Sequence, residues 1–377
     1  MNYEKQLGGL SAHQFLKKHW QTTPLLIHDA IKAGDWSLNL DELIELSQDP
    51  RCSARLVIRS GLKYEVSYGP VTKKELENLP KKNWTLLVQG INHVHYGVDK
   101  LLSLFSFIPF SRLDDVMVSY AAPGGGVGPH YDSYDVFLLQ GTGVRQWEVG
   151  MPRSMELLPN QELRILKSFV PDGTCQMQTG DMLYLPPEYG HHGVALEPCL
   201  TYSIGFNSPR YDHVKSEFLH YLDQEIELPG FFEDPNRRQT QVPALIPTDL
   251  LQSIDQKISK IRWSKQDILR FTGEFLTQVG FDDEISARKV ESKSKFLSRL
   301  KKRSYRINSH IKFLYREDLG FIAGEAFTIP QCEQAIFKIF ANHRVVIGKD
   351  IEPNTFFAQT LYKWEQQGYV TKIKTSN

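Results

Sequence analysis

The sequence contains few cysteines and no excess of charge of either sign. Its 377 residues include four cysteines, which lie far apart without a CxxC pair, so neither a disulfide framework nor a structural zinc site is predicted. Lys and Arg together number 44, as do Asp and Glu, so no overall electrostatic field favours nucleic acid or an anionic membrane. We expect reduced thiols, and any contact with a charged partner must be local.

Long hydrophobic runs are also missing. The apolar stretch at 101–110 is interrupted by Ser103, Ser106 and Pro109, and the first twenty residues contain no run of signal-peptide length. There is no internal repeat and no low-complexity tract. These absences argue against a membrane protein, and we expect a soluble cytoplasmic one.

The composition is that of a globular protein, with 41% hydrophobic and 23% charged residues. A chain of 377 residues is too long for one ordinary hydrophobic core. We therefore expect more than one domain.

Between 116 and 207 the sequence is dominated by short apolar runs, each bounded by Gly, Pro, Asp or Asn. The runs are VMVSY (116–120), DVFLLQG (135–141), RQWEVG (145–150), DMLYLPP (181–187) and TYSIGF (201–206). Several short strands at this spacing predict a sandwich or barrel.

After Pro209 the hydrophobic period becomes helical. Leu250, Ile254, Ile258 and Ile261 are spaced as one face of a helix, with a proline-containing loop predicted at 229–247. A second helix is predicted to begin at the capping pair of Ser264 and Asp267. The last seventy residues alternate strands with helices, which is typical of a small unit of winged-helix type.

One triplet, His130-Tyr131-Asp132, places an imidazole and a carboxylate on the same face of an extended chain. Two histidines and one carboxylate on one face of Fe(II) leave positions open for a keto acid and dioxygen. The third ligand is predicted from His191 or His192, and strand alternation favours His191, with His192 on the opposite face. The alternative is that these are ordinary turn and loop residues.

Arg145 follows the Gly141-Thr142-Gly143 turn and shares a strand face with Trp147 and Val149. A guanidinium can hold the distal carboxylate of 2-oxoglutarate through two parallel hydrogen bonds. The alternative is an arginine that faces solvent.

Three segments resemble the Jumonji C ribosomal oxygenases, and among them most closely the bacterial arginine hydroxylases. They are FLKKHWQTTPLLI (15–27), PGGGVGPHYDSYDVFLLQGTGVRQWEVG (123–150) and GDMLYLPPEYGHHGVALEPCLTYSIGF (180–206). The resemblance implies an α+β chain with three units. These are a double-stranded β-helix of cupin-like type (1–207), a helical dimerisation domain (208–304) and a winged-helix domain (305–377).

The resemblance also implies the site. His130, Asp132 and His191 ligate Fe(II), and Arg145 holds the co-substrate 2-oxoglutarate, with Ser119 and Thr201 lining its pocket. The implied reaction hydroxylates the β-carbon of an arginine in a large-subunit ribosomal protein of the L-sixteen group, and the implied assembly is a homodimer. For the substrate guanidinium, Asp135, Tyr131 and Tyr134 are candidates from position only.

Two other functions stay open. One is an N-methyl demethylase of the same class, and the other is a non-catalytic cupin-like metal protein whose winged helix binds nucleic acid. DNA binding is not favoured, because Lys363 is the only Lys or Arg between Asn354 and Gln367. The basic run 293–306 is a candidate contact for ribosomal RNA, although such runs are more often solvated faces.

Overall fold

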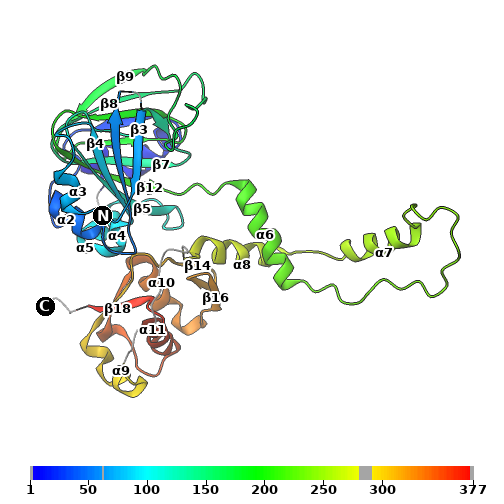
Figure 1. The fold of residues 1–377 in the computed structure, drawn as a ribbon. Helices are drawn as coiled ribbons and strands as arrows, with labels where there is room; N and C mark the ends of the chain where they lie inside the picture. The colour runs from blue at the N-terminus through cyan, green and yellow to red at the C-terminus, as the bar shows by residue number, and fades with distance from the viewer. Residues whose placement is uncertain (1–2, 62, 280–290, 374–377) are drawn as a thin grey trace.

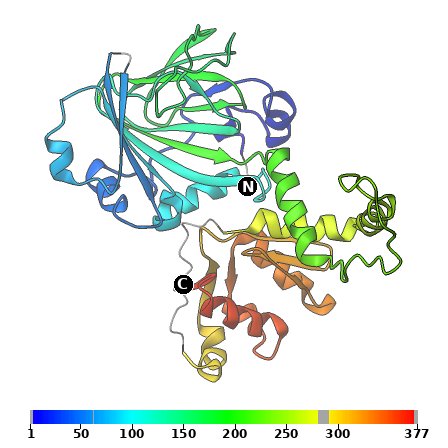
Figure 2. The same ribbon diagram turned by 45° about the vertical axis from the view of Figure 1, so that its right-hand side comes forward.

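The computed structural model describes residues 3–61, 63–279 and 291–373. It forms a strand-rich N-terminal unit, a helical segment that extends away from it, and a smaller C-terminal unit packed beneath the first (Figures 1 and 2). No helix in these ranges is long and apolar enough to span a bilayer.

The N-terminal unit contains twelve strands in two sheets among its described residues. The strands are β1 (Leu25–Ile27), β2 (Ser53–Ser60), β3 (Lys63–Tyr68), β4 (Trp84–Gln89), β5 (Leu113–Ala121), β6 (His130–Tyr131), β7 (Asp135–Thr142), β8 (Arg145–Gly150), β9 (Gly173–Met177), β10 (Met182–Leu185), β11 (Gly190–Ala195) and β12 (Cys199–Phe206). The larger sheet has the order β1-β10-β7-β12-β5-β4-β2-β3, and the smaller has the order β6-β11-β8-β9. All five strand runs predicted between 116 and 207 are strands, and the predicted sandwich or barrel is present as these two sheets.

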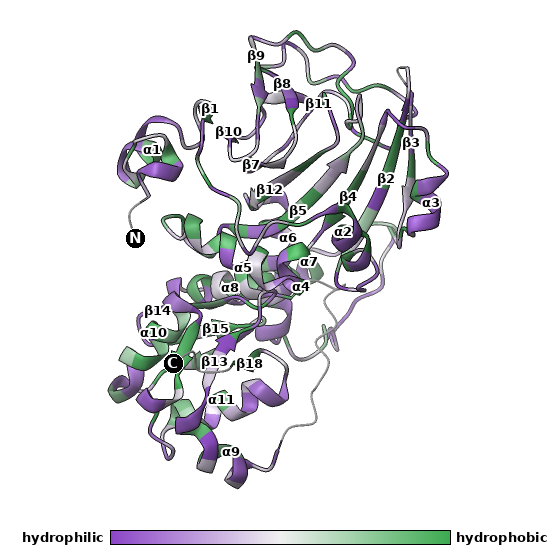
Figure 3. Cartoon of the chain, turned by 90° about the vertical axis from the view of Figure 1, so that its left-hand side faces the viewer, coloured by the Kyte–Doolittle hydropathy of each residue, from purple (hydrophilic) through white to green (hydrophobic). Residues whose placement is uncertain are grey.

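Strand alternation separates two cores. On β12, Leu200, Tyr202 and Ile204 belong to the large core between the sheet and the N-terminal helices, whereas Thr201 lies on the opposite face, between the two sheets. The helices are α1 (Ala12–Lys18), α2 (Leu40–Leu46), α3 (Lys73–Glu77), α4 (Ile91–Val94) and α5 (Tyr96–Leu102). Figure 3 shows hydrophobic stretches (green) along strands of this sheet.

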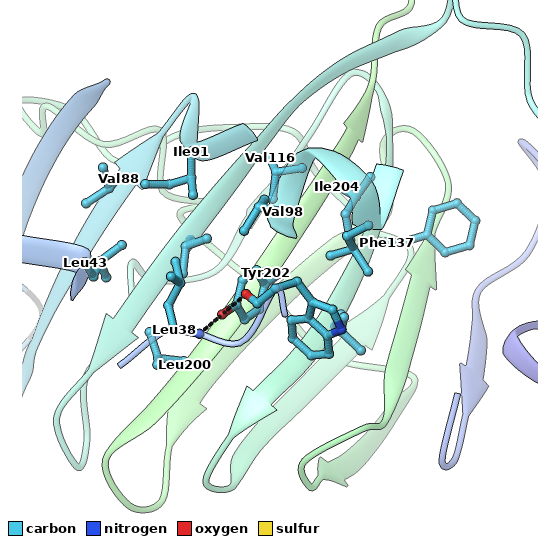
Figure 4. Close-up of a cluster of buried hydrophobic side chains, with 14 of the residues drawn as sticks. Leu38, Leu43, Val88, Ile91, Val98, Val116, Phe137, Leu200, Tyr202 and Ile204 are labelled. Carbon is cyan, nitrogen blue, oxygen red and sulfur yellow. Dashed lines mark hydrogen bonds between the residues drawn. The ribbon is translucent and has the colours of Figure 1, made fainter. Parts of the chain in front are cut away.

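Tyr202 links this core to the chain that covers it. Its hydroxyl donates to the backbone oxygen of Trp36 at 3.1 Å and accepts from the backbone N–H of Leu38 at 2.8 Å (Figure 4). Because a buried hydroxyl is costly without partners, this pair of bonds fixes the covering segment at one place on the sheet.

The chain leaves the sheets through three further helices, α6 (Tyr211–Glu225), α7 (Thr248–Ile258) and α8 (Lys265–Thr277). The predicted capping pair is present, since the Ser264 side chain accepts from the Asp267 backbone and the Asp267 side chain accepts from the Ser264 backbone. The predicted stripe is shorter than expected, because α7 ends at Ile258 and Ile261 lies beyond it. The proline-containing stretch 229–247 is a loop.

Over its described residues, the C-terminal unit has two three-stranded sheets with helices around them. Its elements are α9 (Lys293–Arg299), β13 (Ser304–Ile307), β14 (Phe313–Arg316), β15 (Leu319–Ile322), β16 (Glu325–Thr328), α10 (Gln334–His343), β17 (Val345–Ile347), α11 (Phe356–Gln366) and β18 (Val370–Ile373). It contacts the N-terminal unit directly, with the Arg306 guanidinium 4.4 Å above the Tyr96 ring.

Candidate metal centre

The three predicted metal ligands converge on one point between the sheets. His130 on β6 and His191 on β11 are direct cross-strand partners, and their ring centroids lie 4.2 Å apart. One donor atom from each of His130, Asp132 and His191 lies within 4.8 Å of the others, and His191 Nε2 is 3.6 Å from Asp132 Oδ2. These two nitrogens and one oxygen form the donor set that non-haem Fe(II) takes in oxygenases.

Backbone hydrogen bonds fix the orientation of both imidazoles. His130 Nδ1 donates to the backbone oxygen of Gly128 at 2.9 Å, and His191 Nδ1 donates to that of Tyr189 at 3.0 Å. Since a carbonyl oxygen can only accept, Nδ1 carries the proton in each ring. Each Nε2 is therefore left with its lone pair, which is the form that binds a metal.

The loop before β11 is tied to Asp132. The Glu188 backbone N–H donates to the Asp132 backbone oxygen at 2.7 Å, and Glu188 adopts a left-handed φ of 67°. This conformation is uncommon for a residue other than glycine and is found where the surroundings impose it. Glu188 follows Pro186 and Pro187, and its hydrogen bond holds the chain that leads to His191 next to the Asp132 backbone.

His191 and His192 face opposite sides of β11, as alternation predicts. His191 is buried, and burial together with the neighbouring His130 lowers the pKa of its imidazole, which favours the neutral form. The His192 ring instead meets Glu148, with Nδ1 3.1 Å from Oε2. His192 is therefore directed away from the point where His130, Asp132 and His191 meet.

Arg145 lies on the inner face of β8 and is 5% exposed. Its Nε and Nη2 atoms are buried and have no hydrogen-bond partner among the described residues. A buried guanidinium without an anion is costly, so its surroundings are built for a ligand that carries negative charge. The alternative of a solvent-facing arginine is wrong.

Ser119 and Thr201 are paired residues of β5 and β12 and are both buried. The Thr201 hydroxyl donates to Gln140 Oε1 at 3.0 Å, and the Ser119 hydroxyl donates to the Thr201 backbone oxygen at 3.4 Å. The two hydroxyls thus lie between the sheets, but each already has an acceptor within the protein.

Asp135 is not available to a substrate guanidinium, and that prediction is wrong. Its carboxylate is fully buried and accepts hydrogen bonds from Tyr184, Gln21 and Arg112. Position along the sequence suggested proximity to the metal, but Asp135 begins β7 and its side chain turns to the opposite face from that of its neighbour Val136.

Two acidic residues near Tyr134 were not predicted from the sequence. Burial is the largest cause that raises the pKa of the Tyr134 hydroxyl. The nearby charges of Asp132, Asp115 and Asp114 raise it further. Burial also raises the pKa of the Asp115 carboxyl to about 6. Tyr134, two residues after Asp132 in the chain, therefore stays protonated beside the carboxyl groups of Asp114 and Asp115. Their position in strand β5 gave no motif by which to recognise them.

Comparison with known proteins identifies the family. Residues 100–214 match the model of the JmjC domain. The chain is 35% identical over 266 residues to the ribosomal protein uL16 3-hydroxylase of Escherichia coli, covering 70% of this chain and 70% of that protein. The chain belongs to the JmjC ribosomal oxygenases. It is also 39% identical over 227 residues to a probable ribosomal oxygenase of Haemophilus influenzae, covering 58% of this chain and 55% of that protein.

The structural match extends beyond the JmjC domain. The ribosomal oxygenase YcfD of Escherichia coli, solved in complex with cobalt and 2-oxoglutarate, superposes with a TM-score of 0.80 at 28% identity. The match covers 96% of this chain and 98% of that one. The N-terminal unit is thus a JmjC cupin-like fold, and the helical and C-terminal elements have counterparts in another JmjC ribosomal oxygenase.

Proposed function

We propose that this chain is an Fe(II)- and 2-oxoglutarate-dependent hydroxylase that modifies a ribosomal protein. One observation carries the proposal: two histidines with free Nε2 lone pairs and one carboxylate converge between the sheets, in the same unit as a buried arginine without an anion. His130, Asp132 and His191 are the proposed iron ligands, and Arg145 is the proposed partner of the 2-oxoglutarate distal carboxylate. Ser119 and Thr201 are proposed to line that pocket.

When bound, iron supplies the redox chemistry: 2-oxoglutarate and dioxygen become succinate and CO₂ while one oxygen atom enters a substrate C–H bond. The protein's own task is orientation. The carbonyl oxygens of Gly128 and Tyr189 hold the imidazoles, and Arg145 fixes the keto acid from its far end. Apolar side chains between the sheets, including Trp147 and Leu138, exclude water from the reacting centre.

The substrate we propose is an arginine of the L-sixteen ribosomal protein, hydroxylated at its β-carbon. The support is the name of the Escherichia coli relative, a ribosomal protein uL16 3-hydroxylase, together with the acidic surroundings of Tyr134. A guanidinium guest requires a negatively charged partner, and Asp115 is the proposed one, with Oδ2 accepting from the Gly90 backbone N–H at 3.1 Å. Tyr131 is less accessible to this role, because Arg164 already lies over its ring.

Mass spectrometry of ribosomal proteins from cells with and without this gene tests the proposal. The expected result is one ribosomal protein that is lighter by a single oxygen atom in the deletion strain, with the difference mapped to one arginine. Identical masses for all ribosomal proteins in the two strains would contradict it.

The two other functions are separated from this one by their products. A demethylase releases formaldehyde and leaves no oxygen on the product, whereas a hydroxylase leaves the oxygen in place. A cupin-like protein that only binds a metal produces no succinate at all. The similarity to the uL16 3-hydroxylase favours hydroxylation over both.

We propose that the helical region predicted at 208–304 forms a homodimer through the part that precedes α9. None of the residues of α7 is buried, and Leu251, Ile254 and Ile258 lie exposed along one helical face. The helix is carried away from the sheets on extended chain, where a second copy can cover it (Figure 1). This apolar face is the main support for the dimer.

The residues after the helical domain are proposed to form a winged helix that serves docking or structure. The support is the order of α10, β17, α11 and β18, although Phe296 and Leu300 also belong to this unit's core. We therefore place its start before α9 rather than at 305.

Contact of the basic run with ribosomal RNA stays a prediction, and the structure weakens its electrostatic basis. Arg299 and Arg303 both pair with Glu291, and Lys301 pairs with Glu352. DNA binding is not proposed. A ribosomal-protein substrate is consistent with a cytoplasmic location of this protein.

A further inference from the structure

Three small side chains form a cluster between the two sheets. Ala121, Ala195 and Cys199 pack together there, from β5, β11 and β12. Ala195 is the cross-strand partner of Arg145 in the smaller sheet, and Ala121 is the cross-strand partner of Thr85 in the larger. Arg145 and Thr85 therefore lie on opposite sides of this small-residue cluster, one in each sheet.

Thr85 points into the space between the sheets. On β4, Leu86 and Val88 belong to the core on the helix-covered side, so Thr85 faces the other way. Thr85 is 1% exposed, and its Oγ1 has no hydrogen-bond partner among the described residues. Burying an unsatisfied hydroxyl is unfavourable, so the site favours an acceptor that the protein chain itself does not supply.

A glycine lies next to this hydroxyl, where backbone atoms leave no room for a side chain. A Cβ at Gly125 would lie 3.0 Å from Thr85 Oγ1 and would collide with the backbone oxygen of Trp84. Gly125 also bonds across to the smaller sheet, because its carbonyl oxygen accepts from the Ala195 N–H at 3.0 Å. The Thr85 hydroxyl thus lies next to a backbone segment that is hydrogen-bonded to Ala195, the cross-strand partner of Arg145.

The two unpaired groups complement one ligand. Arg145 offers Nε and Nη2, and Thr85 offers one O–H. A carboxylate has two oxygens with about four acceptor sites, so it can take a guanidinium fork and a hydroxyl together. The pocket residues predicted from the sequence are less suited, because the Thr201 hydroxyl is already used by Gln140.

We propose that the Thr85 hydroxyl donates a hydrogen bond to the distal carboxylate of 2-oxoglutarate, next to Arg145. This inference rests on the proposed function and adds a co-substrate-binding residue to it.

Titration of 2-oxoglutarate into the oxygen-free, Fe(II)-loaded protein tests this, with the visible charge-transfer band as the readout. Thr85→Val keeps the shape and removes the donor, and we expect about 10-fold weaker binding, as for a lost hydrogen bond to a charged group. Thr85→Ser should restore the affinity. Thr85→Ala provides a second donor-free variant if the valine protein does not fold.

A keto acid without a distal carboxylate, 2-oxobutyrate, is the matched control ligand. Its affinity should be unchanged by Thr85→Val, and the effect of Thr85→Val on 2-oxoglutarate should shrink in an Arg145→Gln background because both residues bind one group. Equal 2-oxoglutarate affinity in the wild type and Thr85→Val, or an equal loss for 2-oxobutyrate, would overturn the inference. If the unsubstituted protein bound no 2-oxoglutarate, the proposed function itself would fail.

Discussion

His130 and His191 are held by the same local device on two adjacent strands. Each Nδ1 donates to the backbone oxygen two residues earlier in the chain, and the two residues face each other in the β6–β11 ladder. The metal-facing nitrogens are therefore set by backbone geometry rather than by other side chains. A site built in this way is organised before a metal arrives, since neither ring has to change tautomer.

The two adjacent histidines of β11 should differ sharply when substituted. His191→Ala removes a proposed ligand, so iron affinity should fall by more than the roughly 10–100-fold typical of changes to residues that only support a ligand. His192→Ala should leave the iron content of the purified protein near that of the wild type, because His192 contacts Glu148 on the other face. Metal analysis after dialysis gives the answer, and the reverse order of the two variants would show that the ligand assignment is wrong.

Arg145 should govern co-substrate affinity rather than metal affinity. Replacing it with Gln removes a charged donor pair, and 2-oxoglutarate should bind roughly 10–100-fold more weakly. Arg145→Lys should recover only part of this loss, because an ammonium keeps the charge but not the fork. The KM for 2-oxoglutarate and the iron content are measured together, and a parallel fall in iron content would point to a structural role instead.

Asp115 should favour substrate binding at the expense of stability. Burial raises the pKa of its carboxyl from 3.8 to about 6, so folding disfavours the ionised form. The cost is absent below pH 4, grows as the pH rises towards 6 and is complete above it. Asp115→Asn should therefore increase the free energy of unfolding at pH 7.5 by roughly 1–3 kcal/mol and change it little at pH 3.5.

The same variant should raise the KM for the arginine substrate while leaving the affinity for 2-oxoglutarate unchanged. Denaturant unfolding at the two pH values and steady-state kinetics measure the two effects separately. A variant that is more stable yet binds substrate as well as the wild type would exclude Asp115 from substrate recognition.

The exposed face of α7 should control assembly. Introducing charge through Ile254→Glu and Ile258→Glu makes the face unfit for burial, and we expect a monomer in analytical ultracentrifugation. The matched control is Gln252→Glu, which adds charge on the same helix without altering these apolar residues. An unchanged sedimentation coefficient for the double variant would place any dimer interface elsewhere.

The features that could be predicted from the sequence are those that depend on local interactions. The strand runs, the capping pair of Ser264 and Asp267, and the opposite orientations of His191 and His192 all follow from periods of two or 3.6 and from neighbours in sequence. The convergence of His130, Asp132 and His191 was predictable because these residue types at this spacing resemble a known iron-binding motif.

Features that arise from sheet pairing were not predictable. Asp135 was misassigned because its bonds run to Tyr184 and Arg112, which are distant in sequence. Thr85 was missed for the same reason, since only the order β12-β5-β4 in the large sheet brings it next to the cluster of Ala121, Ala195 and Cys199. Neither residue lies in a motif, and a single sequence contains no record of strand order.

The most direct test of the proposed hydroxylase activity uses the purified protein, Fe(II), 2-oxoglutarate, dioxygen and the L-sixteen ribosomal protein. Each molecule of succinate released should be matched by one oxygen atom gained on a single arginine, and Asp132→Ala should abolish both. Succinate without an oxygen on the ribosomal protein, or full activity in Asp132→Ala, would contradict the proposed activity.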